Sequence, residues 1–395
     1  MTHTDVKTIS VIGAGTMGVG IAQIFLLSNA EKVNLIDISE TTLKKARSTL
    51  KKYIHKLGSK NFFQRDGDAE RIVNKLNSST QLDRKVFNSD LIIEVIPEDI
   101  ELKKNLLSKI GNQSGSNTII ASNTSTFTIT ELGEASNKPE KTIGMHFFVP
   151  PFMQSCIEVM KGEKTRDEVF HRTIEFCKTI PAKNGTMFVA PIQKDTPGFI
   201  SNRLLIPGNL YLNILADKAA EKDIPIEQLD ADAYPFMKVG PYELCDYLGL
   251  DTNYKALKSF EKRVSPEFAP GNVLTELVKN GYYGKKTGRG FYTYDEDGRP
   301  LIDKTKKAGL LDPELLLAIQ LNESCKMLEE NIVPNYSIIE KVMKIGIGTP
   351  APFTPGKHNY KNWSDKLTIF AGENNKSYFE PCSLMKTGKF INMRI

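Results

Sequence analysis

The sequence predicts an α/β domain with a parallel sheet at the N-terminus, followed by mostly α-helical domains. Up to Lys194, short apolar runs alternate with segments whose apolar residues have helical spacing. Strands that alternate with helices in this way favour a parallel sheet covered by helices on both faces. From Phe199 onward the helical spacing dominates. The turn-forming cluster Asp195–Gly198 is the predicted hinge between the two parts.

Each predicted element of the first part is a short, recognisable run. Met17–Leu27 and Thr41–Leu57 have helical periodicity. The predicted buried strands are Ile9–Ile12, Val33–Asp37, Leu91–Ile96, Thr118–Ala121, Ile143–Phe148 and Phe188–Pro191.

The predicted domain boundaries are 1–193 for the α/β domain, 194–300 for a helical domain and 310–395 for a second helical domain. The segment 295–313 is polar and punctuated by Gly and Pro, which indicates a linker. Leu212-Asn213 recurs as Leu321-Asn322, and Thr287-Gly288 recurs as Thr387-Gly388. We interpret the third segment as a degenerate copy of the second.

Composition excludes several classes of protein. With 52 Lys+Arg against 47 Asp+Glu, the net charge of +5 suits anionic small molecules and gives no reason to expect nucleic acid binding. The five cysteines are scattered, as in a reducing compartment, and no metal site is expected. The polar N-terminus leaves no room for a signal peptide, and no apolar run is long enough to span a membrane. We therefore expect a cytoplasmic protein.

A glycine-rich turn follows the first predicted strand and opens the first predicted helix. Gly13, Gly15 and Gly18, with Thr16 and Met17 between them, fit the pattern G-x-G-x-x-G. In this context the glycines permit a tight turn, close approach of a pyrophosphate and close packing of the helix. The helix N-terminus favours the diphosphate anion. The α/β domain is therefore predicted to be a Rossmann-type dinucleotide-binding domain.

Asp37 ends the second strand, where a carboxylate can accept hydrogen bonds from the adenosine ribose hydroxyls. Ile38 and Ser39 follow it, so no arginine is offered to a 2′-phosphate. The expected cofactor is NAD, although FAD can use the same turn.

His146 and Glu158 are the candidates for acid–base chemistry. A histidine titrates near neutral pH, so His146 can accept a hydroxyl proton as a hydride leaves. Glu158 lies in an apolar run beyond the Pro150-Pro151 turn, from which it can return to face and orient the imidazole. A packed core histidine and a solvent-facing glutamate are the alternatives from these residues alone.

Two further polar residues stand at the ends of elements. Ser125 closes the run Ser122–Ser125 after a predicted strand, at the edge of the sheet where ligands bind in α/β folds. Asn202 begins the helical part. Either side chain could instead cap a helix or bridge two helices.

The ordered motifs from Ile9 to about Tyr294 resemble those of the L-3-hydroxyacyl-CoA dehydrogenases of fatty-acid β-oxidation. The matching segments are VIGAGTMGVGIAQ (11–23), DLIIEVIPED (90–99), ASNTS (121–125), GMHFF (144–148), KDTPGFISNRLL (194–205), VGPYELCDYLGLD (239–251) and GKKTGRGFY (284–292).

The resemblance implies a role for each matching residue. His146 takes the position of the family's catalytic base, Glu158 that of its paired carboxylate, and Ser125 that of the serine that hydrogen-bonds the reacting oxygen. Asn202 takes the position of the asparagine that helps to hold the substrate. The cofactor-contacting positions of the family fall on Glu98, Lys103 and Asn123.

The sequence departs from the family pattern in three places. Val149 stands where the family usually has asparagine. The segment 48–75, where the family contacts the adenine end of coenzyme A, aligns poorly, so its substrate candidates are Lys51, Lys52, His55 and Lys56. The extra segment 310–395 resembles the second C-terminal copy of multifunctional β-oxidation proteins, and no enoyl-CoA hydratase domain accompanies it.

The expected function is therefore that of an oxidoreductase, the NAD-dependent oxidation of a 3-hydroxyacyl-CoA to a 3-oxoacyl-CoA. One alternative is a dehydrogenase of a 3-hydroxy acid without coenzyme A. Another is a non-catalytic NAD-binding scaffold that docks a hydratase. An enoyl-CoA hydratase or thiolase is the expected partner class, and the second copy could replace the contact through which single-copy relatives dimerise.

Overall fold

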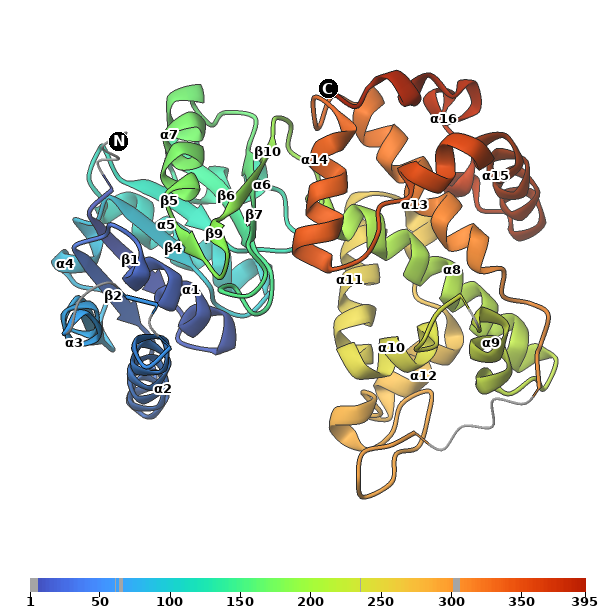
Figure 1. Cartoon of the computed structure of the whole chain (residues 1–395), viewed down its shortest axis with the longest axis horizontal. Coiled ribbons are helices and arrows are strands. Elements are labelled where there is room, and N and C mark those ends of the chain that lie inside the picture. The colour runs from blue at the N-terminus through green and yellow to red at the C-terminus, as the bar shows by residue number, and fades with distance from the viewer. Residues whose placement is uncertain (1–5, 61, 64–66, 235, 301–305) are drawn as a thin grey trace. The chain divides into compact units, whose positions relative to one another are not determined.

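A computed structural model describes residues 6–60, 62–63, 67–234, 236–300 and 306–395 (Figure 1). The chain divides into two compact units. The first comprises Met1–Ser201 and Asn331–Pro350, and the second comprises Asn202–Glu330 and Ala351–Ile395. The last part of the chain, from residue 310 to 395, therefore contributes to both units. The predicted division into sequence domains stays a prediction, and the predicted linker 295–313 lies partly outside the described residues.

The first unit is an α/β domain, as predicted. Its strands are β1 (Thr8–Ile12), β2 (Lys32–Ile36), β3 (Leu76–Ser79), β4 (Leu91–Glu94), β5 (Ile119–Ser122), β6 (Thr142–Phe147), β7 (Cys156–Lys161), β8 (Pro181–Ala182), β9 (Gly185–Thr186) and β10 (Phe188–Ile192). Its helices are α1 (Thr16–Leu27), α2 (Glu40–Gly58), α3 (Asp68–Val73), α4 (Arg84–Phe87), α5 (Ile100–Gln113), α6 (Ile129–Ala135), η1 (Pro139–Lys141), α7 (Asp167–Lys178), α14 (Tyr336–Lys341) and η4 (Val342–Ile347).

An eight-stranded sheet organises this unit in the order β10-β7-β6-β5-β4-β1-β2-β3. All neighbouring strands are parallel except β6 and β7, which are antiparallel. The chain reverses between them at the predicted Pro150-Pro151 turn. The predicted strands are confirmed. Two further strands of the sheet were not among them: β3, whose sequence LNSS has no apolar run, and β7, which was noted only as the apolar run that holds Glu158.

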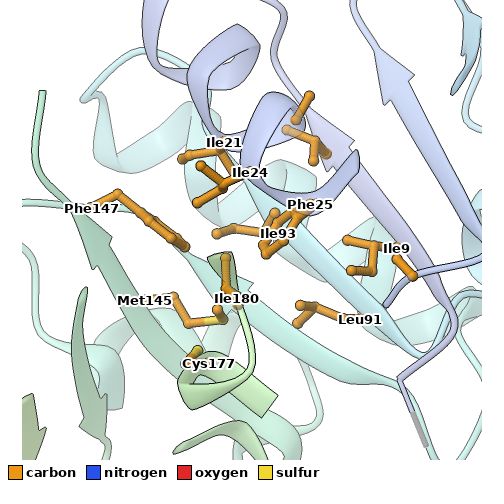
Figure 2. Packing of buried hydrophobic residues seen from close by; sticks show 14 of the residues in the cluster. Ile9, Ile21, Ile24, Phe25, Leu91, Ile93, Met145, Phe147, Cys177 and Ile180 are labelled. Carbon is orange, nitrogen blue, oxygen red and sulfur yellow. The ribbon is translucent and has the colours of Figure 1, made fainter. Parts of the chain in front are cut away.

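The core on one face of the sheet determines which way β6 presents its side chains. Met145 and Phe147 are buried in this core together with Phe25 of α1 and Cys177 of α7 (Figure 2). The rings of Phe25 and Phe147 meet edge to face at 6.0 Å. Because successive side chains of a strand point to opposite faces, His146 lies on the other face of the sheet.

The second unit is helical, also as predicted. Its elements are α8 (Ser201–Glu221, whose first residue belongs to the first unit), α9 (Ile226–Ala233), α10 (Pro241–Leu248), α11 (Leu250–Arg263), η2 (Pro266–Phe268), α12 (Asn272–Lys279), η3 (Lys285–Thr287), α13 (Pro313–Glu329), α15 (Phe353–Asn374), η5 (Ser377–Phe379), α16 (Ser383–Thr387) and η6 (Lys389–Asn392). Among the described residues, no helix is both long and apolar enough to cross a membrane.

A buried ion pair joins α8 to α13 within this unit. The Arg203 guanidinium lies 3.2 Å from the carboxylate of Glu323 and 2.6 Å from that of Glu330. Glu323 is fully buried, so burial opposes its ionisation, but Lys326 and Arg203 lower its pKa overall. A buried charge is tolerated only when it is paired in this way.

Candidate active site

The glycine-rich turn connects β1 to α1, and two of its glycines are sterically required. Gly13 has φ +111°, and a Cβ there would lie 2.5 Å from the Val95 carbonyl oxygen. A Cβ on Gly18 would lie 1.8 Å from the Gly13 carbonyl oxygen. At Gly15, by contrast, a Cβ would meet no atom within 4 Å. Only glycine therefore fits at positions 13 and 18. The space beside Gly15 lets a diphosphate approach the backbone of the turn.

Asp37 is fixed beside this turn at the end of β2. Its Oδ2 accepts a hydrogen bond from the Ala14 N–H at 2.9 Å, and its Oδ1 accepts one from the Ser39 N–H at 2.9 Å. The carboxylate is half-buried, whereas Ile38 is almost fully exposed. First-turn N–H groups of a helix have no acceptor within the helix, so the start of α1 adds donors for an anion. These residues fit an adenine dinucleotide.

His146 and Glu158 face each other across the antiparallel pair β6–β7. The strand register places them directly opposite. The His146 Nδ1 lies 2.6 Å from the Glu158 Oε2. The histidine side chain is 12% exposed and the glutamate is fully buried. Because an ionised carboxylate only accepts hydrogen bonds, this contact assigns the proton to Nδ1 and leaves a lone pair on Nε2.

Glu158 also accepts hydrogen bonds from the chain segment that begins α8. Its Oε1 accepts from the backbone N–H groups of Ile200 and Ser201 at 3.0 and 2.9 Å, and its Oε2 accepts from the Ser201 hydroxyl at 2.9 Å. These donors compensate for burial of the charge. The sequence pattern did not mark Ser201, although it stands next to the candidate Asn202.

Two phenylalanine rings flank the His146 imidazole. The ring centroids of Phe148 and Phe199 each lie 5.2 Å from that of His146, at interplanar angles of 62° and 37°. Phe199 has φ +57°, an uncommon conformation for a bulky residue. A Cβ on Gly144 would lie 2.9 Å from the Phe199 ring, so this glycine makes room for it. The base candidate is thus held on two sides as well as at Nδ1.

The loop after β5 is tied to the same edge of the sheet. The Asn123 Oδ1 accepts a hydrogen bond from the Phe147 N–H at 3.0 Å, next to His146 in the chain. The Glu98 Oε1 accepts from the Thr124 hydroxyl at 2.6 Å and from the Ser125 N–H at 2.9 Å. Ser125 is half-buried, and its loop is fixed by hydrogen bonds to Glu98 and to Phe147 of β6.

Lys103 lies beneath this loop and is 1% exposed. Its Nζ lies 2.8 Å from both carboxylate oxygens of Glu94 and 3.2 Å from the Glu98 Oε2. Burial raises the pKa of Glu94, whereas for Glu98 the Lys103 ammonium and the loop donors outweigh burial and lower the pKa. Lys103 thus positions the Glu98 carboxylate, and Glu98 in turn accepts the hydrogen bonds that fix the loop after β5.

A cavity of about 1110 Å³ extends from the glycine-rich turn along α2. Of the four substrate candidates on α2, only Lys56 lines it. Lys51 and Lys52 are exposed elsewhere, and the Nδ1 of His55 lies 3.6 Å from Glu70. The lining residues that the sequence reasoning missed include Lys45, Thr49, Tyr53, Lys60, Phe62 and Lys183. The first three share one face of α2 with Lys56, a periodicity that could have identified them.

The structure also shows where the other residues named from the sequence lie. Thr16 and Val149 both line the cavity, and Val149 is 59% exposed. Met17 packs against the core of the first unit. Asn202 is the second residue of α8 and the first of the second unit. Among the described residues, no group of three or more His, Cys, Asp or Glu could hold a metal ion.

The fold and this site define an NAD-binding dehydrogenase, and comparison with known proteins specifies the family. Residues 8–188 match the model of the 3-hydroxyacyl-CoA dehydrogenase NAD-binding domain, and residues 198–294 match that of the 3-hydroxyacyl-CoA dehydrogenase C-terminal domain. The chain belongs to the 3-hydroxyacyl-CoA dehydrogenase family and is an NAD-dependent enzyme.

Individual relatives differ in how much of the chain they match. The mitochondrial hydroxyacyl-coenzyme A dehydrogenase of Rattus norvegicus is 35% identical over 298 residues, 73% of this chain and 91% of that protein. The fatty acid oxidation complex subunit alpha of Shewanella amazonensis is 30% identical over 95% of this chain, which spans 54% of its length. The crystallised 3-hydroxybutyryl-CoA dehydrogenase from Escherichia coli K12 has the same fold throughout, with a TM-score of 0.81, 23% identity and coverage of 98% of this chain and 99% of that one.

The contrast between Gly13 and Gly15 gives a testable prediction. Gly15→Val should keep the melting temperature, because the space around Gly15 is open, but should lose NAD affinity. Gly13→Ala should lower both, because its Cβ meets backbone and its φ is left-handed. Calorimetric titration with NAD and thermal unfolding measure the two effects. Retained NAD affinity in Gly15→Val would contradict the assignment of the diphosphate to this turn.

Proposed function

We propose that the protein catalyses the reversible oxidation of an (S)-3-hydroxyacyl-CoA to a 3-oxoacyl-CoA with NAD⁺. The observation that carries this proposal is the His146–Glu158 pair, with Nδ1 and Oε2 2.6 Å apart and Nε2 left as the basic atom. Family membership supports the same reaction.

In this mechanism, bound NAD⁺ supplies the hydride acceptor. His146 takes the proton of the substrate hydroxyl group at Nε2 and becomes imidazolium. Glu158 stabilises that cation through the hydrogen bond at Nδ1, and the donors around Glu158 keep the carboxylate in place. In the reverse direction the imidazolium returns the proton to the carbonyl oxygen.

The other site residues are proposed to orient the reactants. Ser125 hydrogen-bonds the reacting oxygen, and Asn202 helps to hold the substrate. Glu98, Lys103 and Asn123 act on the cofactor side of the site. The hydrogen bonds of Glu98 and Asn123 to the loop after β5 and to β6 support a positioning role for them.

Replacement of either member of the catalytic pair tests the mechanism. His146→Ala should lower kcat with 3-hydroxybutyryl-CoA about 10²- to 10⁴-fold, with NAD affinity largely kept. Glu158→Gln should give a loss of the same order, because an amide neither fixes the tautomer nor stabilises imidazolium. NADH formation followed by absorbance measures both. Unaltered turnover in His146→Ala would exclude His146 as the base.

The cavity along α2 is proposed to bind the phosphorylated end of coenzyme A. Lys45, Lys56, Lys60 and Lys183 line it and can neutralise phosphates, while Tyr53 and other apolar lining residues offer surfaces for adenine. The name of the rat relative, a hydroxyacyl-coenzyme A dehydrogenase, supports a coenzyme A thioester as substrate.

The lysines of this cavity separate the proposal from the alternative of a free 3-hydroxy acid. Lys56→Ala and Lys60→Ala should each raise KM for the thioester 3-hydroxybutyryl-CoA about two- to fivefold, with kcat unchanged, because each removes one exposed charge contact. Lys51→Ala, on α2 but outside the cavity, is the matched control. Equal KM values in all variants, or faster turnover of free 3-hydroxybutyrate than of its thioester, would favour the alternative.

The part of the chain after residue 193 is proposed to contain two copies of one domain, 194–300 and 310–395, although α14 of the second copy belongs to the first unit. The elements recur in order: α8, α9, η2 and α12 correspond to α13, α14, η5 and α16. One hydrogen bond recurs as well. The Asn213 Oδ1 accepts from the N–H of Gly271, the residue before α12, and the Asn322 Oδ1 accepts from that of Cys382, the residue before α16.

The second copy is further proposed to replace a dimer contact. The 395-residue chain should then be a monomer of 44.2 kDa in solution, which size-exclusion chromatography with light scattering measures. A concentration-independent mass of twice that value would contradict the proposal.

The upstream partner class is a hydratase that produces 3-hydroxyacyl-CoA, and a thiolase would consume the product. A cytoplasmic location stays a prediction.

A further inference from the structure

The C-terminal segment Asn331–Pro350 is part of the first unit, together with the His146–Glu158 pair. It is attached beside β10: the Gln193 N–H donates to the Ile332 carbonyl oxygen at 3.0 Å, and the Lys341 Nζ lies 5.3 Å from the centroid of the Phe188 ring. Figure 1 shows α14 of this segment in orange, next to the green strands. The segment lies beyond both ranges that match the family models.

The segment ends in a π-helical turn, η4, that contacts β7. Gly346 lies in this turn and is buried. A Cβ on Gly346 would lie 2.8 Å from the Phe148 Cζ and 2.9 Å from both Cε atoms. No real Cβ approaches a ring so closely, so the tip of the Phe148 ring occupies the space that a side chain at 346 would need.

Phe148 transmits this contact to the imidazole. It lies two residues after His146, just beyond the end of β6, and its ring meets the imidazole ring edge to face at 5.2 Å. Phe148 as a whole is only 9% exposed, and its ring is in contact with both Gly346 and the imidazole, so it has little freedom to move. A shift of the Phe148 ring therefore changes the packing on one side of the His146 imidazole.

We propose that Gly346 is a positioning residue for the reaction: by lacking a side chain it lets Phe148 pack against His146, and so fixes the imidazole plane. The inference rests on the proposed role of His146 as the base. It gives the C-terminal segment a part in catalysis, in addition to any part in oligomer formation. Because a misplacement of about 1 Å can cost two orders of magnitude in rate, one methyl group at this site is enough to matter.

The test is Gly346→Ala in the 395-residue chain. The new methyl group must displace the buried Phe148 ring, so a moderate fall in melting temperature is expected, and kcat is measured at a temperature where the variant is folded. We expect kcat to fall about 10- to 100-fold and the pH profile of kcat/KM to change, with the KM for NAD kept. Gly372→Ala is the matched control, because Gly372 is also helical but a Cβ there meets no atom within 4 Å. It should behave as the wild type does.

A double-variant cycle separates positioning from general damage. Phe148→Leu removes the ring that the new methyl group meets, so it should lower kcat by itself, and Gly346→Ala should cost little further in that background. Losses that do not add support the proposal. Wild-type kcat in Gly346→Ala, or losses that add in the double variant, overturn it.

A spectroscopic readout keeps this test independent of the proposed reaction. The Phe148 ring current acts on the imidazole protons of His146, whose NMR signals should move in Gly346→Ala and keep their wild-type positions in Gly372→Ala. If the wild-type protein fails to oxidise 3-hydroxyacyl-CoA, the proposed function falls, but these signals still decide the packing claim. Signals unmoved by Gly346→Ala overturn it.

Discussion

The buried carboxylate of Glu158 is the constraint on which the site depends. It is fully buried, and its charge is compensated by four donors: the imidazole of His146 on β6, and the N–H of Ile200 and the N–H and hydroxyl of Ser201 at the start of α8. Removing any donor leaves a charge in a medium of low dielectric constant, which costs more than the lost hydrogen bond is worth. The same interactions that make the carboxylate tolerable therefore position His146, the proposed base.

The aromatic walls of His146 show how the fold supports this centre from a distance. Phe199 packs where Gly144 has no side chain, and Phe148 packs where Gly346 has none. One of these glycines is in the strand that carries the histidine, and the other comes from the far end of the chain. Close packing leaves no slack between such groups, so the position of the imidazole is set by volume as well as by hydrogen bonds.

Local patterns in the sequence predicted the parts of the structure that local chemistry determines. The glycine-rich turn, the position of Asp37 and the alternation of strands and helices depend on residues close together in the chain. The pairing of His146 with Glu158 could also be predicted, because a short connection through two prolines joins their strands. The packing of Lys103 against Glu94 could not: Glu94 lies in the predicted buried strand Leu91–Ile96, but nothing in the sequence marks Lys103 as its partner.

Contacts between residues far apart in the chain could not be predicted from local sequence patterns. Ser201 and Gly346 matter through neighbours far away in the sequence, and no periodicity marks them. The internal repeat stays a proposal. In the sequence it matches Thr287-Gly288 with Thr387-Gly388, whereas the proposed order of elements pairs α12, which precedes Gly281, with α16, which precedes Gly388. Both glycines have left-handed φ angles, of 73° and 69°.

The tautomer of His146 tests the central claim most directly. Two-bond ¹H–¹⁵N correlation spectra of the protein, with the His146 signals assigned by substitution, distinguish a protonated from an unprotonated ring nitrogen. At a pH where the imidazole is neutral, the hydrogen bond to Glu158 predicts that Nδ1 carries the proton and Nε2 does not. A proton on Nε2, with Nδ1 unprotonated, would contradict both the charge on Glu158 and the assignment of His146 as the base.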